Sequence, residues 1–305
     1  MKGPVPATRP CPVCARESHR PYLKKGAQVL VQCTNCEAVY ASPLPQEVAQ
    51  GTYYTAQGGY YLSSNKLQSD FSPVRFQRET RLFQRFCPQG AVLDVGCSTG
   101  GFLQHLNACF PGRYQTWGID VSRPAVAHAR GLGLSVQCGG FAEAKLSRST
   151  FDAITFWAVM EHLVAPAVYL RRAAALLSPG GWCFILVPNL RSLAVRLLGK
   201  RYRYFMEEHI NWFSAATLRR LIALEPSLTA RHLTTTHFNP LVIAQDARRA
   251  RDHVPAEERA ALLKRTTAWK QHPLLLPVRL AYRLSERCLA QFNLADNLVL
   301  VAQRS

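Results

Sequence analysis

The residues best placed to do chemistry lie in the stretch VLDVGCSTGGF, residues 92–102. An apolar run containing Asp94 leads into a turn with Gly96 and Gly100, and an apolar-periodic segment follows, which predicts a strand, a tight loop and a helix. Glycines let the backbone approach a ligand closely, and the free N–H groups at the start of a helix favour negative charge. Asp120 ends a second predicted strand about twenty residues further on, where an acid accepts hydrogen bonds from the two ribose hydroxyls. The pattern predicts the nucleoside-binding half of a doubly wound sheet.

The same loop also matches the nucleophile turn of hydrolases. In that alternative, Ser98 would be the nucleophile, and Asp152 with His209 or His237 would complete a triad in the required chain order. Asp94 argues against it, because the strand before such a serine is normally apolar, and no His-Gly oxyanion loop precedes the strand. We therefore prefer the nucleoside-binding interpretation and keep the α/β-hydrolase as an alternative.

Four cysteines near the start of the chain form a second chemical motif. Cys11 and Cys14 make one Cys-x-x-Cys pair, and Cys33 and Cys36 make another. The separation of the two pairs is typical of a tetrahedral zinc site with four thiolate ligands. The residues between the pairs can form a hairpin, and a module this small needs the metal in order to fold. We expect a zinc ribbon with a structural Zn²⁺ ion; a redox dithiol is the alternative, although redox motifs rarely come in such matched pairs.

Asp94-x-Gly96-x-Ser98-x-Gly100 resembles the first motif of class I S-adenosylmethionine-dependent methyltransferases, with serine where glycine is commoner. The segment from Phe151 to His162 and the Ser-Pro-Gly-Gly turn at 178–181 resemble later motifs of that superfamily, in the expected order. The similarity covers about two thirds of the chain. It implies an α/β fold with a doubly wound, Rossmann-like sheet of seven strands, and S-adenosylmethionine as the cofactor.

The resemblance also assigns residues to the cofactor. It implies that the first loop holds the methionine part, that the acid after the second strand binds the ribose, and that the loop after the third strand contacts the adenine. The residues that we expect to bind the cofactor are Asp94, Gly96, Cys97, Ser98, Gly100, Asp120, Val121, Phe141, Ala142, Phe156 and Trp157. The last two are included because a continuous apolar run, typical of a central parallel strand, brings them to the carboxyl edge of the sheet.

Glu161, His162 and His209 are the candidate catalytic residues. Histidine titrates near neutral pH, so His162 and His209 are candidates for a general base or for a group that orients the acceptor. His209 belongs to a segment that resembles the Glu-His-x-x-x-Phe-Ser sequence of methyltransferases with a zinc ribbon. Some ubiquinone-type O-methyltransferases carry Glu-x-x-Glu-His as metal ligands where Glu161 and His162 stand, but the first of those positions is Ala158 here, which argues against a catalytic metal.

The composition restricts the partners and the cellular location. The chain has 305 residues, 48% of them hydrophobic, which is enough for one full core and a small extra domain. A net charge of +18 and an isoelectric point near 9.9 indicate an anionic partner, such as nucleic acid, a phosphorylated substrate or an acidic membrane surface. Residues 1–11 lack the apolar run of a secretory signal, and no segment is long and apolar enough to span a bilayer, so we expect a cytoplasmic protein.

Three regions are predicted along the chain. Residues 1–45 form the zinc ribbon, residues 46–90 a helical linker that caps the substrate, and residues 91–305 the methyltransferase domain. A helical, arginine-rich C-terminal insertion at about 240–294 interrupts the last region. Residues 274–284 combine apolar and basic faces; we favour a lid packed on the core, and peripheral contact with an anionic membrane surface is the alternative.

The methyl acceptor is the least constrained part of the prediction. Proteins that resemble this chain tend to act in sugar and cell-envelope biosynthesis, which favours a hydroxyl of a sugar, a glycan or a lipid-linked intermediate. An RNA base is the alternative, because some ribosomal RNA methyltransferases also join a zinc ribbon to this fold and the net charge of +18 suits phosphate binding. However, the chain lacks an Asn-Pro-Pro-Tyr-like motif, and its arginines are spread through helices. A scaffold that binds the donor without catalysis is a third interpretation, and no oligomeric state is predicted.

Overall fold

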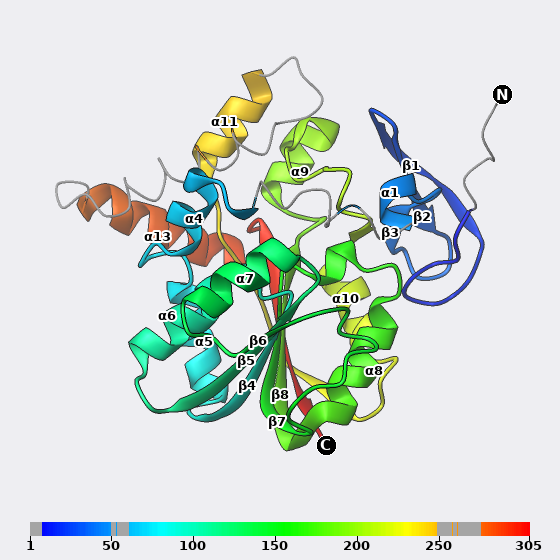
Figure 1. Ribbon diagram of the computed structural model, residues 1–305. Coiled ribbons are helices and arrows are strands. Elements are labelled where there is room, and N and C mark those ends of the chain that lie inside the picture. Colours follow the sequence, from blue (N-terminus) through cyan, green and yellow to red (C-terminus); the bar gives the residue numbers. More distant parts are fainter. Residues whose placement is uncertain (1–7, 50–52, 54–60, 249–257, 259–260, 262–275) are drawn as a thin grey trace.

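A seven-stranded sheet is the centre of the structure, a computed structural model that describes residues 8–49, 53, 61–248, 258, 261 and 276–305 (Figure 1). The strands lie in the order β10-β11-β8-β7-β4-β5-β6, and β11 is antiparallel to both of its neighbours. Their bounds are β4 Gly90–Val95, β5 Tyr114–Asp120, β6 Val136–Cys138, β7 Phe151–Trp157, β8 Leu177–Pro188, β10 Leu228–Thr236 and β11 Asn297–Arg304. This order confirms the predicted α/β fold with a doubly wound sheet of seven strands.

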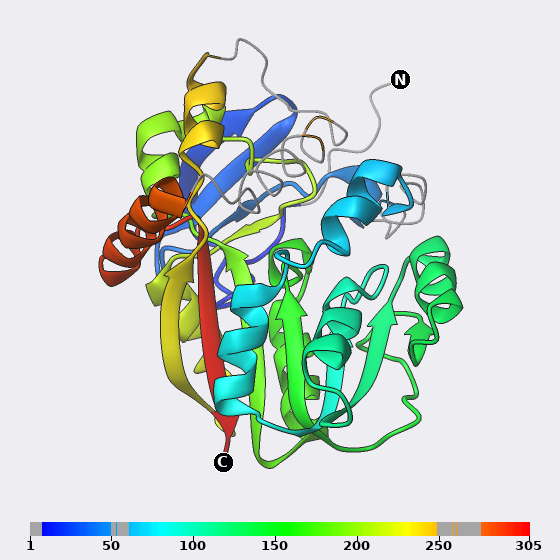
Figure 2. The same ribbon diagram turned by 90° about the vertical axis from the view of Figure 1, so that its left-hand side faces the viewer.

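Helices cover both faces of this sheet (Figures 1 and 2). One face carries α5, α6 and α7, and the other carries α8 and α10. Their bounds are α5 Gln77–Phe86, α6 Gly101–Cys109, α7 Arg123–Gly131, α8 Pro166–Leu176 and α10 Ala215–Ile222. Because both faces are covered, a central parallel strand such as β7 is mainly apolar, with Asp152 and Thr155 as its polar residues. On the first face, the ring centroids of Phe83 and Phe184 lie 4.7 Å apart inside an aromatic cluster.

A second sheet contains the N-terminal ribbon and lies beyond the carboxyl ends of the central parallel strands (Figures 1 and 2). Its order is β1-β2-β3-β9, and all of its pairings are antiparallel. The bounds are β1 His19–Lys25, β2 Gln28–Cys33, β3 Val39–Ala41 and β9 Asn211–Trp212. The first three strands come from the ribbon, whereas β9 belongs to the larger domain. The two parts therefore share a sheet, which the local sequence pattern did not indicate.

The remaining helices of the described residues are short, apart from α13. Their bounds are α1 Gln46–Ala49, α4 Ser64–Asp70, η1 Met160–His162, α9 Leu193–Leu198, η2 Gly199–Arg201, α11 Pro240–Arg248 and α13 Leu276–Gln291. Helices α11 and α13 lie within the predicted insertion, but most residues between them, including Leu274 and Leu275 of the amphipathic segment, lie outside the described residues. Within the part of the chain that the structure describes, no helix is both long enough and apolar enough to cross a membrane.

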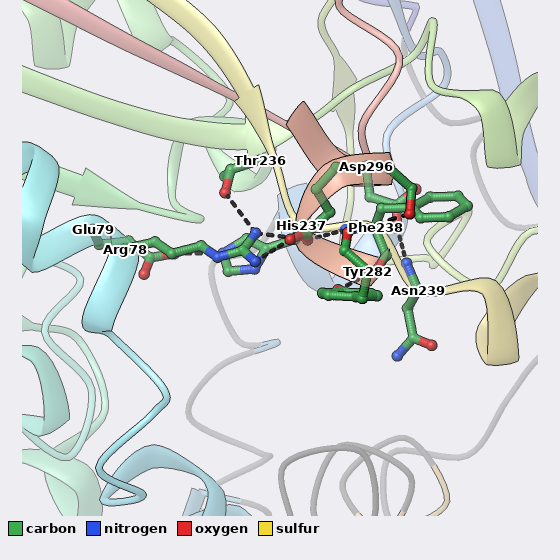
Figure 3. A network of polar contacts seen from close by, with 10 residues as sticks. Arg78, Glu79, Thr236, His237, Phe238, Asn239, Tyr282 and Asp296 are labelled. Carbon is green, nitrogen blue, oxygen red and sulfur yellow. Dashed lines mark hydrogen bonds and ion pairs between the residues drawn. The ribbon is translucent and has the colours of Figure 1, made fainter. Parts of the chain in front are cut away.

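A network of polar contacts holds α13 against the central domain (Figure 3). Arg78 on α5 forms an ion pair with Glu286 on α13, and Glu286 Oε1 also accepts a 3.0 Å hydrogen bond from the N–H of Phe238. Beside them, His237 Nε2 lies 2.6 Å from Glu79 Oε1. Burial alone would raise the pKa of Glu79, but the neighbouring His237 and an arginine lower it to about 2, so the carboxylate is charged. These contacts attach the end of the insertion to α5 and to the end of β10.

Candidate functional site

A cavity of about 900 Å³ lies at the carboxyl edge of the central sheet. Its lining runs from the loop after β4, past the ends of β5 and β7, to the segment 202–209 beside the ribbon. Crevices form at this edge of open α/β sheets where the connections on either side of a strand leave in opposite directions. The volume is large enough for a nucleoside-sized ligand together with a second small molecule.

The loop after β4 approaches the cavity with its backbone. Gly96, Ser98 and Gly100 have φ angles of 75°, 50° and 85°, which lie in the left-handed region that favours glycine. A Cβ atom at Gly96 would lie 2.6 Å from Val159 Cγ2, and one at Gly100 would lie 2.3 Å from Leu134 Cδ1. The tight turn predicted from the sequence is therefore present, and larger residues would disrupt it.

Two acids, the buried Asp94 and the half-buried Asp120, support this loop. Asp120 accepts hydrogen bonds of 2.8 Å from the backbone N–H groups of Ser98 and Ser122, so it joins the end of β5 to the first loop. Burial raises the pKa of Asp120, and the N–H donors partly oppose that effect. Asp94 accepts a 2.6 Å hydrogen bond from the Thr155 hydroxyl, and burial raises the pKa of Asp94 to about 7. Asp120 thus lies at the cavity with its orientation fixed.

Most of the predicted cofactor residues share this cavity. Those in its lining are Asp94, Gly96, Cys97, Ser98, Asp120, Val121, Phe141, Ala142 and Trp157. Gly100 does not line the cavity, but its positive φ angle is part of the tight turn of the first loop. Phe156 does not line the cavity, which corrects our expectation for it: the side chain is fully buried, with its ring 6.0 Å from that of Phe141. Successive side chains of a strand point to opposite faces of the sheet, so Phe156 and Trp157 point in opposite directions, and Trp157 is the one that lines the cavity.

Glu161, His162 and His209 come together in the lining of the same cavity. One potential ligand atom from each lies within 4.8 Å of those of the other two, and all three residues line the cavity. The two imidazole centroids are 4.8 Å apart, with the rings inclined at 72°. Glu161 and His162 belong to η1, directly after β7, whereas His209 precedes β9. The structure therefore brings the three predicted catalytic residues into one cluster.

The surroundings determine the protonation of this cluster. His162 Nδ1 lies 2.8 Å from the carbonyl oxygen of Glu208, so Nδ1 donates a proton and Nε2 carries the lone pair of the neutral ring. Burial lowers the pKa of His162, although Glu208 opposes this effect. The Glu208 side chain in turn accepts a 3.0 Å hydrogen bond from the Tyr53 hydroxyl. Glu161 is fully buried, its carboxyl oxygens have no hydrogen-bond partner among the described residues, and burial raises its pKa to about 8. At neutral pH the cluster therefore contains a neutral His162 and a protonated Glu161.

The same cluster could hold a divalent cation. Carboxylate and imidazole groups are common metal ligands, and three protein ligands leave coordination positions for other groups. A cation would also satisfy the carboxyl oxygens of Glu161. Ala158, at the turn between β7 and η1, provides no fourth ligand.

Replacing Glu161 with glutamine is expected to flatten the pH dependence of stability. The pKa of about 8 replaces an ordinary value of 4.5, so folding takes up a proton between these pH values. The free energy of unfolding therefore falls as the pH rises through this range, by up to about 1.4 kcal/mol per pH unit, and glutamine removes that contribution. Denaturant unfolding at several pH values from 5 to 8 measures the slope. An equal slope in both proteins would mean that Glu161 is already charged, as a bound cation would cause.

Several residues of the cavity lining were not predicted from the sequence, among them three charged ones near the first loop. Lys66, Asp70 and Arg75 come from α4 and the turn before α5, a region without a recognised motif. Lys66 Nζ donates a 2.6 Å hydrogen bond to Asp70 Oδ1, and the Thr99 hydroxyl donates to Asp70 Oδ2 at 3.4 Å. These contacts join α4 to the first loop. The available signal was the spacing of Lys66 and Asp70, which places opposite charges on one helix face.

The hydrolase alternative is wrong. Asp152 lies at the opposite edge of the sheet, where its Oδ2 accepts a 2.8 Å hydrogen bond from the N–H of Ala91. His237 is bonded to Glu79, and the Ser98 hydroxyl has no hydrogen-bond partner within the described ranges. The described residues thus form no triad around Ser98.

The four N-terminal cysteines form a second cluster. Cys11 Sγ lies 3.4 Å from Cys36 Sγ, Cys14 Sγ lies 3.5 Å from Cys33 Sγ, and all four sulfur atoms lie within 4.8 Å of one another. In a tetrahedral site with Zn–S bonds of about 2.3 Å, sulfur atoms are separated by about 3.8 Å. The donor set and its spacing therefore fit Zn²⁺.

Comparison with known proteins agrees with this site. A family model described as a methyltransferase domain matches residues 73–224, about half of the chain. The chain is 28% identical over 199 residues to a ubiquinone biosynthesis O-methyltransferase from Albidiferax ferrireducens, a match that covers 57% of this chain and 75% of that protein. It is 33% identical over 147 residues to a protein of the same name from Burkholderia pseudomallei, covering 44% of this chain and 62% of that protein.

The fold has a counterpart among solved structures. A chain from the complex between the Haloferax volcanii Trm112 methyltransferase activator and a methyltransferase matches with a TM-score of 0.52. The sequence identity is 15%, and the match covers 83% of this chain and 97% of that chain, so the likeness concerns the fold alone. The family model, in contrast, spans the first loop, Asp120 and the cluster of Glu161, His162 and His209. The N-terminal ribbon has four cysteines whose spacing fits a zinc site. Since the motifs, the strand order and the family match agree, we conclude that the chain belongs to the class I S-adenosylmethionine-dependent methyltransferases.

Proposed function

We propose that this protein transfers a methyl group from S-adenosylmethionine to a hydroxyl group of a small-molecule or lipid-linked acceptor. The observation that carries the proposal is that one cavity is lined both by the first loop with Asp120 and by the cluster of Glu161, His162 and His209. A donor site and a group able to accept a proton are what O-methylation needs. The names of the relatives from Albidiferax and Burkholderia support a hydroxyl acceptor.

The donor is proposed to lie along the loop side of the cavity. Asp120 would accept hydrogen bonds from the ribose hydroxyls, while Phe141 and Ala142 would contact the adenine. Arg75 also lines the cavity, and its buried Nε has no hydrogen-bond partner among the described residues. We propose that Arg75 attracts the carboxylate of the methionine part, because a guanidinium binds a carboxylate through paired hydrogen bonds.

The cluster is proposed to act on the acceptor. Methyl transfer from a sulfonium is an in-line displacement: the hydroxyl oxygen would attack the methyl carbon, the methyl–sulfur bond would break with its electron pair left on the sulfur of S-adenosylhomocysteine, and the hydroxyl proton would move to a base. His162 Nε2 is our candidate for that base, because Nδ1 is already committed to the Glu208 carbonyl. His209 would orient the acceptor. A cation held by the cluster would supply an alternative means of lowering the pKa of the hydroxyl.

The walls of the acceptor side favour a ring compound. Tyr53, Tyr61, Tyr202 and Tyr204 line the cavity, and such side chains offer flat apolar surfaces together with hydroxyl groups. A hydroxyl of a sugar, a glycan end or a lipid-linked ring fits this description, as does a phenol. Glu161 and His209 are only 0% and 4% exposed, which favours an acceptor that enters the cavity over an extended polymer.

Transfer of labelled methyl groups tests the proposal. The protein would be incubated with radiolabelled donor and, in parallel, with simple phenols, nucleotide sugars, a lipid extract and total RNA. We expect label in a methyl ether of one of the first three. Label in RNA bases, together with steeply salt-dependent RNA binding, would replace the acceptor proposal, and binding of the donor without any transfer would indicate a scaffold.

Zinc in the ribbon is expected to be structural. We propose that Cys11, Cys14, Cys33 and Cys36 bind one Zn²⁺, which elemental analysis of the purified protein should detect. Cys36→Ser should lose the metal and lower the melting temperature, because a ribbon of this size is held together by its ion. Cys109→Ser is the matched control, since Cys109 is exposed and far from the cluster in sequence. Full metal content and an unchanged melting temperature in Cys36→Ser would contradict the site.

A further inference from the structure

The ribbon contributes buried polar side chains to both segments that carry the catalytic cluster. These segments are residues 158–164, which contain Glu161 and His162, and residues 202–212, which contain His209. We propose that Arg9 and Gln28 of the ribbon are positioning residues for the cluster, so that the ribbon is part of the acceptor side of the active site. This inference rests on the proposed function.

Arg9 joins the two segments directly. Its guanidinium donates hydrogen bonds to the carbonyl oxygens of Val164 at 3.2 Å and Ile210 at 2.7 Å, and to Asn211 Oδ1 at 2.7 Å. It also donates to Ala41 O at 3.0 Å, within the ribbon. Arg9 is 8% exposed, and no carboxylate forms an ion pair with it among the described residues. The acceptors of this buried guanidinium are three backbone carbonyl groups and one side-chain amide oxygen, and they satisfy its donors only in one geometry. Arg9 therefore fixes the ribbon and the two cluster segments relative to one another.

Gln28 holds the backbone of the segment that presents His209. Its Nε2 donates to the carbonyl oxygens of His209 at 2.8 Å and Met206 at 3.0 Å. Lys25, also buried in the ribbon, donates to the carbonyl oxygen of Tyr202 at 3.2 Å. This segment has little regular structure before β9. The carbonyl oxygens of Tyr202 and Met206 also accept backbone N–H groups within the segment, so the ribbon side chains add donors that hold its backbone in place.

Asn211, in the segment of residues 202–212, forms hydrogen bonds with the segment of residues 158–164. Its Nδ2 donates to the carbonyl oxygens of Met160 at 2.9 Å and Leu163 at 2.7 Å, on either side of Glu161 and His162. The N–H of Ile210 donates to the carbonyl oxygen of Glu161 at 2.9 Å. Asn211 also belongs to β9, which pairs with β3 of the ribbon. The cluster is therefore attached to the ribbon through its backbone on both sides.

The donor side is supported differently. The first loop is held by Asp120 and by the contacts of Asp70 with Lys66 and Thr99, none of which belongs to the ribbon. Loosening the ribbon should therefore change the acceptor side of the cavity and leave donor binding intact. A ribbon that only stabilised the whole fold would affect both sides together.

Variants of the full-length, zinc-loaded protein test this separation. Gln28→Leu removes the donor to His209 with little change in volume, Arg9→Lys keeps the charge but loses the forked geometry, and Arg20→Ala is the control. Arg20 is exposed in the same ribbon and bonds only Gln32 among the contacts that the structure gives for its side chain. Hydrogen exchange of residues 158–164 and 202–212 is compared with that of residues 93–106, calorimetry measures binding of S-adenosylhomocysteine, and kcat is measured with an acceptor that the parent methylates.

We expect faster exchange in the two cluster segments of Gln28→Leu and Arg9→Lys, by about tenfold, since one lost buried hydrogen bond changes an opening equilibrium by about that factor. Exchange of residues 93–106, the affinity for S-adenosylhomocysteine and the KM for the donor should stay at the parent values while kcat falls. Unchanged exchange and kcat in both variants would overturn the inference, as would equal effects of Arg20→Ala. If the parent shows no turnover with any acceptor, the proposed function fails, whereas selective exchange in the cluster segments would still support the ribbon contacts.

Discussion

His162→Ala is expected to lower kcat by about 10²–10⁴-fold while the affinity for S-adenosylhomocysteine stays unchanged, because a general base contributes a factor of that size to the chemical step. His162 follows β7 and lines the cavity, and in our proposal its Nε2 takes the proton because Nδ1 lies 2.8 Å from the Glu208 carbonyl oxygen. In our proposal, donor binding depends on the first loop and on Asp120, whereas His162 acts on the acceptor. Turnover assays and calorimetry on the same preparations measure the two effects.

The pH profile gives a second measure of this role. Burial lowers the pKa of His162, so its neutral, proton-accepting form persists below the ordinary histidine range. kcat of the parent should therefore rise with pH through a pKa below about 6.5 and then level off. His232→Ala is a matched control, because His232 packs on Phe86 at a centroid distance of 5.7 Å and does not line the cavity. Parent-like turnover in His162→Ala would remove the residue from the mechanism and point to His209 or to a bound cation.

Asp120→Ala is expected to weaken binding of S-adenosylmethionine and S-adenosylhomocysteine by about 100-fold or more, since hydrogen bonds to a charged group contribute about 1.5–3 kcal/mol each. The carboxylate has two functions in our proposal: it would bind the ribose, and it accepts the N–H groups of Ser98 and Ser122. Alanine removes both. Calorimetric titration with either ligand measures the loss directly.

A graded variant separates the two functions of Asp120. Asp120→Asn keeps an oxygen that can accept the N–H of Ser98 but loses the negative charge, so its affinity should fall between those of the parent and Asp120→Ala. Thermal unfolding shows whether the loop, and not the ligand contact, accounts for the change. Retained affinity in Asp120→Ala would mean that the nucleoside does not lie against the end of β5.

Local sequence patterns were sufficient for the donor half of the site. The apolar run before Asp94 predicts a buried strand. The glycines of the first loop indicate a backbone conformation that few other residues tolerate, and the acid marks the end of the second strand. The positive φ angles of Gly96 and Gly100 confirm this interpretation. Phe156 was the exception, because periodicity shows that a strand is buried but leaves open which of two adjacent side chains faces the ligand.

The acceptor half depended on contacts between distant segments. His162 and His209 were recognised from the sequence as separate candidates, but their 4.8 Å ring separation and the Glu208 carbonyl that selects the tautomer arise only when the chain folds. The same is true of the contacts of Arg9, a residue two positions before Cys11 that the sequence analysis did not single out.

The sequence by itself therefore determined the fold class, the first loop, the acid at the end of β5 and the four-cysteine motif, because each is encoded within a few neighbouring residues. Only the tertiary structure decided that the ribbon shares a sheet with β9, that Arg9 and Gln28 bond the segment of residues 202–212, and that Asp152 lies at the wrong edge for a triad. The physical reason is that the hydrogen-bond partners of buried polar side chains come from segments that are distant in sequence and adjacent only in the folded protein. Local sequence periodicity carries no information about which distant segments become adjacent.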